Sequence, residues 1–262
     1  MKHQSGPCTV NSLWVGPRLG VLHTACLNSF LRHGHRVILH VYEPPQDTPT
    51  GVELFDAARL MKQDELRREH WKQSYALSSD IYRYRMLQAD MGAWIDADVY
   101  CLRPLPDTEY LFGWENDTSI NGAVLKMPAQ CALLQALCKA AEDPTFIPPW
   151  LKRSRKEKLR WRKRLGIAKP VTKMPWGTIG PMLLTHLIAE MELGDQALPI
   201  DFLYPLSYGN TNLLFEPGLS LKDITTHRTI AIHLWNSLLR KRPVPARSPL
   251  AEIIGAAGGH LE

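Results

Sequence analysis

Blocks of apolar residues separated by turn-forming residues predict a strand, a helix and a second strand in the first part of the chain. Residues 10–15 are a strand candidate before a Gly-Pro pair, and residues 37–42 form a β-branched apolar run before two prolines. Between them, residues 19–32 carry apolar side chains at helical spacing, with Gly34 as the expected C-cap. This order implies a right-handed crossover in a mostly parallel sheet.

The pattern in the middle of the chain predicts further helices and strands. Residues 51–60 fit either a short strand or a turn of helix, and residues 64–75 have a polar helical pattern. Ser78 or Ser79 is the expected N-cap of a helix that runs through Ala89. The later elements are expected to be strands over residues 110–113, 120–126 and 230–234, and helices over residues 128–141 and 181–191.

Two segments lack a pattern that faces a core. Residues 143–175 hold many prolines and a dense basic run, so we expect an inserted, mobile or surface-lying segment. From Pro243 the chain is rich in small residues and prolines, and we expect this tail to fray. The predicted fold class is α/β, a Rossmann-type mixed sheet flanked by helices, with a helical and basic C-terminal elaboration.

A glycine, a short apolar strand and two carboxylates follow the central helix. Gly92 ends the helix, residues 93–95 form the strand, and Asp96 and Asp98 come directly after it. In extended backbone, residues two apart project to the same side. Paired carboxylates at the carboxyl end of a buried strand can hold a divalent cation, at the edge where open α/β sheets bind ligands. The alternative is that both aspartates cap turns.

Length and composition fit a globular protein. The 262 residues are 45% hydrophobic and 22% charged. No run reaches the ~18 apolar residues that cross a bilayer. The first residues enter a strand without an apolar signal segment, so a cytoplasmic location is expected. The five cysteines have no C-x-x-C spacing and are expected to be free thiols.

One segment accounts for the formal net charge of +5. Nine basic residues and a single acid, Glu157, lie between Lys152 and Arg164, so the rest of the chain is net acidic. Trp161 and Leu165 are four apart, and a helix would set this apolar edge beside the cations. Such a patch indicates an anionic surface, the inner face of the plasma membrane, and not a nucleic-acid groove. A solvated, disordered charge run is the alternative.

The stretch between Ser79 and Val99 resembles the D-x-D signature of a family of sugar transferases. The matching positions are Ser79, Asp80, Arg83, Leu87, Gly92, Ile95, Asp96, Asp98 and Val99. This family contains yeast initiating mannosyltransferases, α-1,4-galactosyltransferases and clostridial glucosylating toxins, which have a GT-A fold and retain the anomeric configuration. Residues 13–16 look like the family's first strand, and residues 202–206 and 232–236 look like its C-terminal blocks.

The resemblance implies a retaining transferase that moves a hexose from a nucleoside diphosphate sugar to a saccharide or lipid-linked saccharide. UDP-galactose and UDP-glucose are the favoured donors, with GDP-mannose open. The implied setting is bacterial surface polysaccharide or lipopolysaccharide synthesis. On this hypothesis, residues 1–142 are the GT-A core that binds the nucleotide sugar. Residues 143–175 are the basic insert, residues 176–242 the acceptor side of the same domain, and residues 243–262 a tail.

The resemblance also implies roles for residues of the central motif. Asp98 binds Mn²⁺ or Mg²⁺, and Asp96 contacts ribose hydroxyls or reaches the metal through water. Asp80 and Arg83 face the donor, although their spacing also fits an ion pair within one helix. These four residues are the candidate catalytic set. Residues 177–181 can present backbone amides to phosphate or acceptor, or simply cap a helix.

Further candidates lie outside the central motif. Trp14 is expected to stack on the nucleotide base, or else to be a core residue. His233 ends a predicted strand, and a nitrogen ligand beside carboxylates suits manganese better than magnesium; Asn236 or Ser237 can replace it. Asn121 is expected to line the sugar pocket, with a simple β-turn as the alternative.

Two other functions fit parts of the sequence. A haloacid-dehalogenase-type phosphatase also places D-x-D after an apolar strand, but it leaves Asp80 and Arg83 without a role. A non-catalytic, membrane-docked carbohydrate-binding protein would keep the fold without turnover. A transferase hydrolyses nucleotide sugars, and a phosphatase releases phosphate from simple esters. A binding protein does neither, so the two assays distinguish the three functions.

Overall fold

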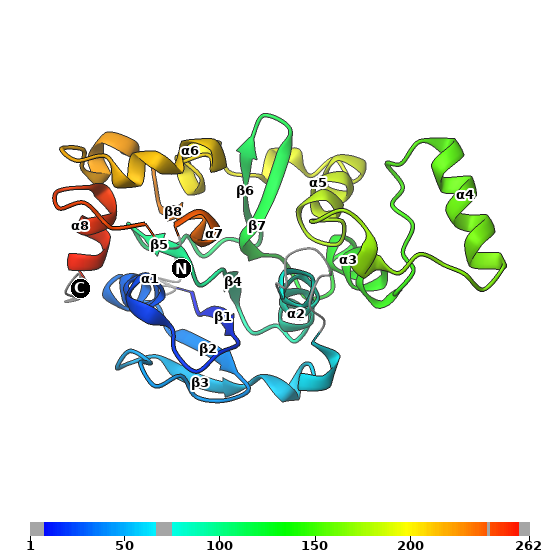
Figure 1. Ribbon diagram of the computed structural model, residues 1–262, viewed down its shortest axis with the longest axis horizontal. Coiled ribbons are helices and arrows are strands. Elements are labelled where there is room, and N and C mark those ends of the chain that lie inside the picture. The colour runs from blue at the N-terminus through cyan, green and yellow to red at the C-terminus, as the bar shows by residue number, and fades with distance from the viewer. Residues whose placement is uncertain (1–7, 67–74, 240–241, 257–262) are drawn as a thin grey trace, which may run out of the picture.

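A six-stranded sheet forms the centre of the computed structural model, which describes residues 8–66, 75–239 and 242–256 (Figure 1). Its order is β3-β2-β1-β4-β7-β6. The strands are β1 (Val10–Trp14), β2 (Val37–Val41), β3 (Glu53–Asp56), β4 (Ala93–Ile95), β6 (Leu111–Asn116) and β7 (Ser119–Lys126). The first four strands in this order pair in parallel, and β7 pairs antiparallel with β4 and with β6. Of these six strands, only β7 therefore runs against the others.

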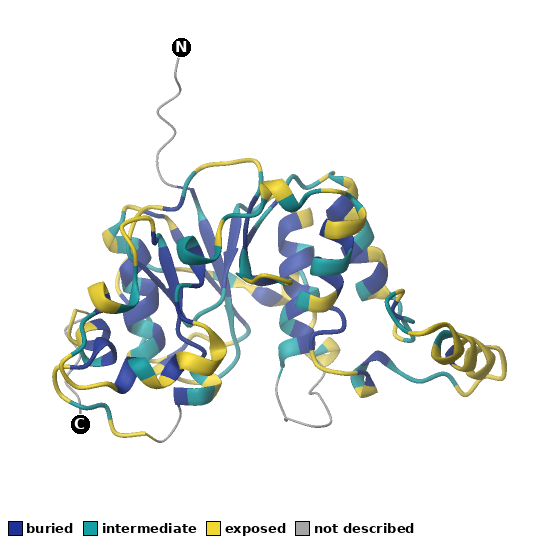
Figure 2. Cartoon of the chain, turned by 90° about the horizontal axis from the view of Figure 1, so that it is seen from above, coloured by how far each residue is buried: buried dark blue, intermediate teal, exposed yellow. Residues whose placement is uncertain are grey.

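Helices cover both faces of the sheet (Figure 2). The helices are α1 (Gly20–Arg32), α2 (Ala76–Gln88), α3 (Ala132–Glu142), α4 (Arg153–Arg164), α5 (Pro181–Glu190), α6 (Ile200–Leu203), α7 (Asn236–Leu239) and α8 (Pro249–Gly255). Neighbouring residues of β4 point to opposite faces: Trp94 packs with α2, α3 and α5, whereas Ile95 packs with α1. The predicted α/β class, a mixed sheet flanked by helices, is confirmed.

A second, two-stranded sheet brings the C-terminal part of the chain onto the acidic motif. β5 (Val99–Cys101) pairs antiparallel with β8 (Ala231–His233), and His233 lies opposite Val99. Tyr100 and Ile232 pack in a core shared with α1 and α8. The register of this small sheet therefore decides which C-terminal residues meet Asp98.

The turn into β4 depends on a glycine. Gly92 has a φ of 108°, and a Cβ at this position would lie 2.6 Å from the backbone oxygen of Thr9. The backbone N–H of Ala93 donates to that same oxygen at 2.9 Å. Because a side chain would block this approach, Gly92 lets β4 enter the sheet beside β1.

The start of α2 differs from the prediction. The helix begins at Ala76 with Tyr75 at the N-cap, so neither Ser78 nor Ser79 caps it. Leu77 is buried in the core with α3 and α5. Burial of this leucine accounts for a helix that begins earlier than the serines alone suggest.

Other boundaries shift for local reasons. The helix expected from residue 128 begins at Ala132, because a turn from Pro128 leads to Cys131 as the N-cap. Residues 51–60 contain both expected alternatives, since β3 leads directly into a 3₁₀ turn. The helix expected over residues 64–75 falls mostly outside the described residues.

Part of the tail is ordered against the body, which contradicts the expected fraying. In α8 the side chains of Leu250, Ile253 and Ile254 are buried against α1 and against Leu214 and Phe215. Ser248 caps this helix by accepting from the backbone N–H of Ala251, and Pro249 occupies its first turn. Apolar side chains at helical spacing therefore decide the structure here, not the small-residue composition.

Two expectations from composition can be compared with the structure. All five cysteines are free thiols, as predicted. Within the described residues, no helix combines the length and the apolar character that crossing a membrane requires.

Candidate functional site

The strand order reverses between β1 and β4, and we call this point the switch point. From β1 the chain passes to β2 and β3 on one side and later returns as β4 on the other side. Open α/β sheets bind ligands at the carboxyl ends of their strands where the order reverses in this way. Trp14 is the last residue of β1, and Asp96 follows the last residue of β4. These two of the predicted donor-side residues thus flank the switch point.

Asp96 is held by its own strand and by α2. The indole Nε1–H of Trp94 donates to Asp96 Oδ1 at 2.7 Å, and Arg83 Nη2 lies 3.0 Å from the same oxygen. The backbone N–H of Asp96 donates to the carbonyl of Ala123 in β7 at 2.7 Å. About a quarter of the side chain, 27%, stays exposed. One carboxylate oxygen is therefore fixed on the protein while the group still reaches the surface of the site.

Arg83 is buried and connects α2, β4 and β7. Its side chain is 8% exposed, Nη1 donates to the carbonyl of Gly122 at 2.8 Å, and the guanidinium lies 5.1 Å from the Trp94 ring centre. The ion pair to Asp80, at 3.5 Å, spans i to i+3 on the helix and is buried on both sides. The guanidinium is surrounded by protein groups on several sides. We therefore interpret Arg83 as a residue that positions the Asp96 carboxylate.

Two glycines make room for this buried ion pair. A Cβ at Gly122 would lie 2.5 Å from Arg83 Nη1, and a Cβ at Gly180 would collide with the Asp80 carboxylate. Gly180 is the N-cap of α5, so the segment 177–181, expected either to present amides to a ligand or to cap a helix, does cap a helix. The structure places that segment against Asp80, which is a contact the sequence did not indicate.

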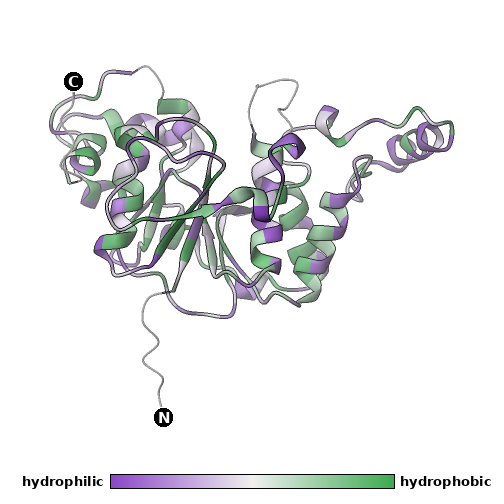
Figure 3. Ribbon diagram, turned by 90° about the horizontal axis from the view of Figure 1, so that it is seen from below, coloured by the Kyte–Doolittle hydropathy of each residue, from purple (hydrophilic) through white to green (hydrophobic). Residues whose placement is uncertain are grey.

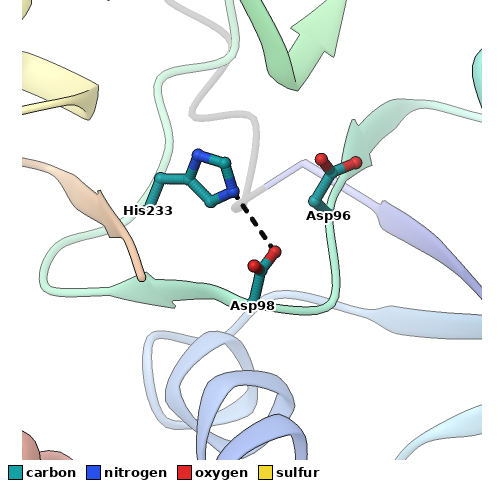
Figure 4. Close-up of side chains that lie close together, drawn as sticks. All are labelled: Asp96, Asp98 and His233. Atoms are coloured by element: carbon teal, nitrogen blue, oxygen red, sulfur yellow. Dashed lines mark ion pairs between the residues drawn. The ribbon is translucent and has the colours of Figure 1, made fainter. Parts of the chain in front are cut away.

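Asp98 lies in a turn and not in extended backbone. The N–H of Val99 donates to the carbonyl of Asp96 at 3.0 Å, which closes a turn over residues 96–99. The extended geometry used to predict that both carboxylates project to one side is therefore wrong. The turn still brings the carboxylates near each other, because both side chains lie on its concave side with His233 (Figure 4).

The small sheet delivers His233 to Asp98. The N–H of Leu234 donates to the carbonyl of Asp98 at 2.9 Å, which extends the ladder of β5 and β8 by one step. His233 Nε2 then lies 3.3 Å from Asp98 Oδ1, and the N–H of Asn236 donates to Asp98 Oδ2 at 2.8 Å. Both oxygens of Asp98 are therefore engaged by the segment 233–236, which leads from the end of β8 into α7.

Trp235 shapes this segment. Its φ of 55° is left-handed, which is strained for a bulky residue and turns the chain from β8 into α7. Its ring lies 4.0 Å from the ring centre of His233, and its Nε1–H donates to the carbonyl of Leu206 at 3.0 Å. Packing of the indole therefore holds both the turn and the imidazole.

The electrostatics of Asp98 and His233 are reciprocal. Burial raises the pKa of the Asp98 carboxyl, but the charge of His233 and the N–H of Asn236 outweigh it, so the pKa lies well below its ordinary value. Burial lowers the pKa of His233, yet Asp98, Asp96 and Glu115 together raise it above its ordinary value. The surrounding carboxylates therefore favour a positive charge at the position of the His233 imidazole.

The arrangement fits a divalent cation. Asp96, Asp98 and His233 each offer a ligand atom, and these atoms lie within 4.8 Å of one another. The Nδ1 atom of His233 is buried and has no hydrogen-bond partner among the described residues. Two carboxylates and one imidazole form a mixed oxygen and nitrogen donor set, which manganese accepts readily. A cation bound here would replace the proton that His233 otherwise carries toward Asp98.

His23 lies between Trp14 and Asn236 and contacts both of them. The Trp14 and His23 rings lie 4.5 Å apart, and the buried Nε1 of Trp14 has no partner among the described residues. The side-chain amide of Asn236 lies 3.1 Å from His23 Nε2, while His23 Nδ1 donates to the carbonyl of Leu19 at 2.7 Å. Trp14 is half-buried, so part of this residue remains exposed.

Asn121 lies in β7 and bonds within the protein. Its amide donates to Glu115 at 2.8 Å and accepts from the N–H of Ala123 at 2.7 Å. The hydroxyl of Tyr204 accepts from the N–H of Val124 at 3.2 Å, beside this pair. Ser237 lies in α7, in the turn after Trp235.

Several residues of the site were not assigned roles from the sequence. Tyr204 and Trp235 lie inside the two C-terminal blocks quoted above, so the blocks located them without indicating their contacts. Glu115 and His23 are isolated polar residues, and no spacing signal identifies such a residue. Gly180 was expected to present an amide to a ligand or to cap a helix, and neither expectation indicated its contact with Asp80.

Comparisons with known proteins give limited information. The sequence matches no protein-family model, and it matches no curated protein. Among solved structures, the fold is similar to "PaToxG Glycosyltransferase", with 12% sequence identity over 71% of this chain and 69% of that chain, and a TM-score of 0.46. A likeness at this level says nothing about the reaction of this chain.

Proposed function

We propose that this chain is a retaining glycosyltransferase that moves a hexose from a nucleoside diphosphate sugar, with UDP favoured, to a saccharide or glycolipid. The observation that supports this most is the convergence of Asp96, Asp98 and His233 at the switch point of the sheet. The sequence places the two aspartates within a signature that resembles D-x-D sugar transferases. The ladder of β5 and β8 adds a third ligand from 135 residues further along the chain.

The chemistry required is stabilisation of a departing diphosphate. A divalent cation, when bound, neutralises the negative charge that develops on that leaving group. Asp98 and His233 are the residues proposed to hold the cation, and Asp96 to hold the ribose or a metal-bound water. Arg83 and Trp94 position Asp96 through the contacts at 3.0 and 2.7 Å. Such positioning lets the carboxylate meet the donor without rearrangement.

The nucleotide is proposed to enter over β1. Trp14 ends that strand with a half-buried ring, and a nucleotide base can stack on such a ring. The unpartnered Nε1–H of Trp14 is a donor for which the described residues provide no acceptor. A ligand carbonyl or phosphate oxygen at this position would supply that acceptor.

The acceptor is proposed to bind in a cavity of about 980 Å³ beside β6. Its lining includes Trp114, Asp201, Asp223 and Arg228, and Leu206 joins it to the packing around Trp235. An aromatic ring with several carboxylates and hydroxyls suits a saccharide, because sugars offer both hydroxyl groups and apolar C–H faces. Arg228 holds Asp201 in a bidentate pair at 2.6 and 2.9 Å, so this wall is preorganised.

The test is turnover of nucleotide sugars with Mn²⁺, measured as release of the nucleoside diphosphate. We expect Asp98→Asn to lower turnover at least about 100-fold, nearly 3 kcal/mol in activation free energy. Asp107→Asn is the matched control, since Asp107 pairs with Lys126 in an exposed ion pair. Full turnover by the Asp98 variant would contradict the proposal. Phosphate release from simple esters would instead favour a phosphatase, and binding of sugars without turnover a carbohydrate-binding protein.

A further inference from the structure

α4 stands apart from the sheet at one end of the molecule (Figures 1 and 2). Its attachment is specific: Leu159 is buried, Lys163 Nζ lies 2.8 Å from Asp143 Oδ2, and Lys156 Nζ donates to the carbonyl of Pro149 at 2.9 Å. After the helix, the N–H of Val171 returns to the carbonyl of Pro144 at 2.7 Å. The helix is therefore held with one side fixed toward the body.

The outer side of α4 is apolar at its centre. Lys156, Leu159 and Lys163 are spaced by three and four residues and share the inner side. Trp161 and Leu165 are four residues apart and lie on the other side, where both are 63% exposed. The helix thus holds its outer side away from the body as an exposed surface.

Exposed apolar side chains are concentrated at this place. Among the described large hydrophobic residues, the three most exposed are Trp161, Leu165 and Ile167, at 63%, 63% and 56%, and all three lie in α4 or directly after it. The N–H of Ile167 closes the helix end by donating to the carbonyl of Arg162 at 3.0 Å, which fixes Ile167 at the C-terminal end of the helix. Clustered exposure of this kind indicates a binding surface.

Cations surround the apolar centre. Lys158, Arg160 and Arg164 line a shallow hollow with Trp161 and with one acid, Glu157. No described residue forms an ion pair with any of these three, whereas Arg153 pairs with Glu157 and Lys163 with Asp143. We name Trp161, Leu165, Ile167, Lys158, Arg160 and Arg164 the α4 outer face. Figure 3 shows the helix as predominantly hydrophilic and separate from the body.

We infer that the α4 outer face docks the protein on an anionic lipid membrane. Cations attract the leaflet, while the indole and the two aliphatic side chains enter the interface between headgroups and acyl chains. Leu165 and Ile167 favour lipid over nucleic acid, because aliphatic side chains make no favourable contact with a phosphate backbone. The rest of the chain is net acidic, so an anionic membrane repels it. This repulsion orients the molecule with α4 toward the membrane. This inference does not depend on the sugar-transfer proposal.

The test is co-sedimentation of the full chain with vesicles of phosphatidylcholine and phosphatidylglycerol, or of phosphatidylcholine alone, at low and high salt. We expect binding to the anionic vesicles at low salt and little binding otherwise. Arg160→Gln with Arg164→Gln should lower the partition coefficient about 25-fold, since each cation near an anionic leaflet contributes about fivefold. The matched control is Lys139→Gln with Lys222→Gln, which removes the same charge from exposed positions elsewhere.

The apolar part has its own variant, Trp161→Ser with Leu165→Ser. We expect it to weaken binding to anionic vesicles while leaving binding to heparin, a lipid-free polyanion, unchanged. Both side chains are exposed, so circular dichroism should show the fold intact. Three results would overturn the inference: no binding to anionic vesicles, equal losses in the double arginine variant and in its double lysine control, or full vesicle binding by the serine variant. The last would identify a surface for polyanions other than lipid.

Discussion

Replacing Arg83 by methionine tests whether the buried ion pairs at the site determine its stability. Methionine keeps much of the apolar stem and removes the charge. The change deletes the bond to the carbonyl of Gly122 and the contacts to Asp96 and Asp80, at 2.8, 3.0 and 3.5 Å. The side chains of Arg83 and Asp80 are only 8% and 11% exposed, so the Asp80 carboxylate loses this ion pair in a largely buried position.

We expect Arg83→Met to lower the free energy of unfolding by about 4 kcal/mol. Removing one partner of a buried ion pair costs about 3–5 kcal/mol, because the other charge stays buried without compensation. If that is the reason, removing the charge of Asp80 as well should recover part of the loss. The double variant Asp80→Asn with Arg83→Met is therefore expected to be more stable than Arg83→Met alone.

The assay is urea unfolding followed by tryptophan fluorescence, with the dependence on urea compared between variants. Arg153→Met is the matched control, since Arg153 pairs with Glu157 on α4 but is 92% exposed. We expect no measurable change there. A loss below about 1 kcal/mol for Arg83→Met, or no recovery in the double variant, would refute the reasoning for the buried pair.

Two further predictions concern close packing and pH. Gly180→Ala should lower turnover about ten- to 100-fold, because its Cβ displaces the Asp80 carboxylate, whereas Gly209→Ala, with open space around it, should not. Equal activity of the two variants would contradict the contact. Burial lowers the pKa of His40 from 6.5 to about 4, so stability is complete above pH 6.5 and falls by roughly 3 kcal/mol as the pH drops to 4. Urea unfolding across this range should show a weaker pH dependence for His40→Gln; an unchanged slope would exclude His40 as the cause.

The tautomer of His40 explains that direction. Asn11 donates its amide N–H to the carbonyl of Met91 at 2.8 Å, so its oxygen faces His40 Nε2 at 2.9 Å and must accept. His40 Nδ1 then accepts from the hydroxyl of Tyr82 at 2.7 Å. A second proton on the imidazole would compete with the Tyr82 hydroxyl, and burial leaves no water to accept it.

The sequence predicted the elements that depend on regular spacing. β1, α1 and β2 lie within two residues of their expected ends, because each has enough residues to show its period. β5 has only three residues, and no alternation can be recognised over that length. Its partner β8 lies more than a hundred residues later, so tertiary pairing alone defines it.

The end of the chain shows a signal that composition obscured. Ser248 and Pro249 form a helix start, and Leu250, Ile253 and Ile254 follow at helical spacing. Small residues and prolines on either side led us to expect fraying. A local pattern of five residues was therefore more informative than the composition of twenty.

The candidate site was predicted in part from the sequence. Asp96, Asp98 and His233 were all identified before the structure placed them together. The reason given for the two aspartates, extended backbone, was wrong, because the hydrogen bond from Val99 closes a turn. The contact of Gly180 with Asp80 was not predictable, since it depends on how α5 packs against α2.

Binding of Mn²⁺ tests the proposed cation site most directly. Electron paramagnetic resonance separates free from bound Mn²⁺ and needs no knowledge of donor or acceptor. We expect the protein alone to lower the free-ion signal, and Asp98→Asn or His233→Asn to restore it, while Asp107→Asn binds as the unaltered chain does. Equal Mn²⁺ binding by all four proteins, or none by the unaltered chain, would contradict a cation held by Asp96, Asp98 and His233.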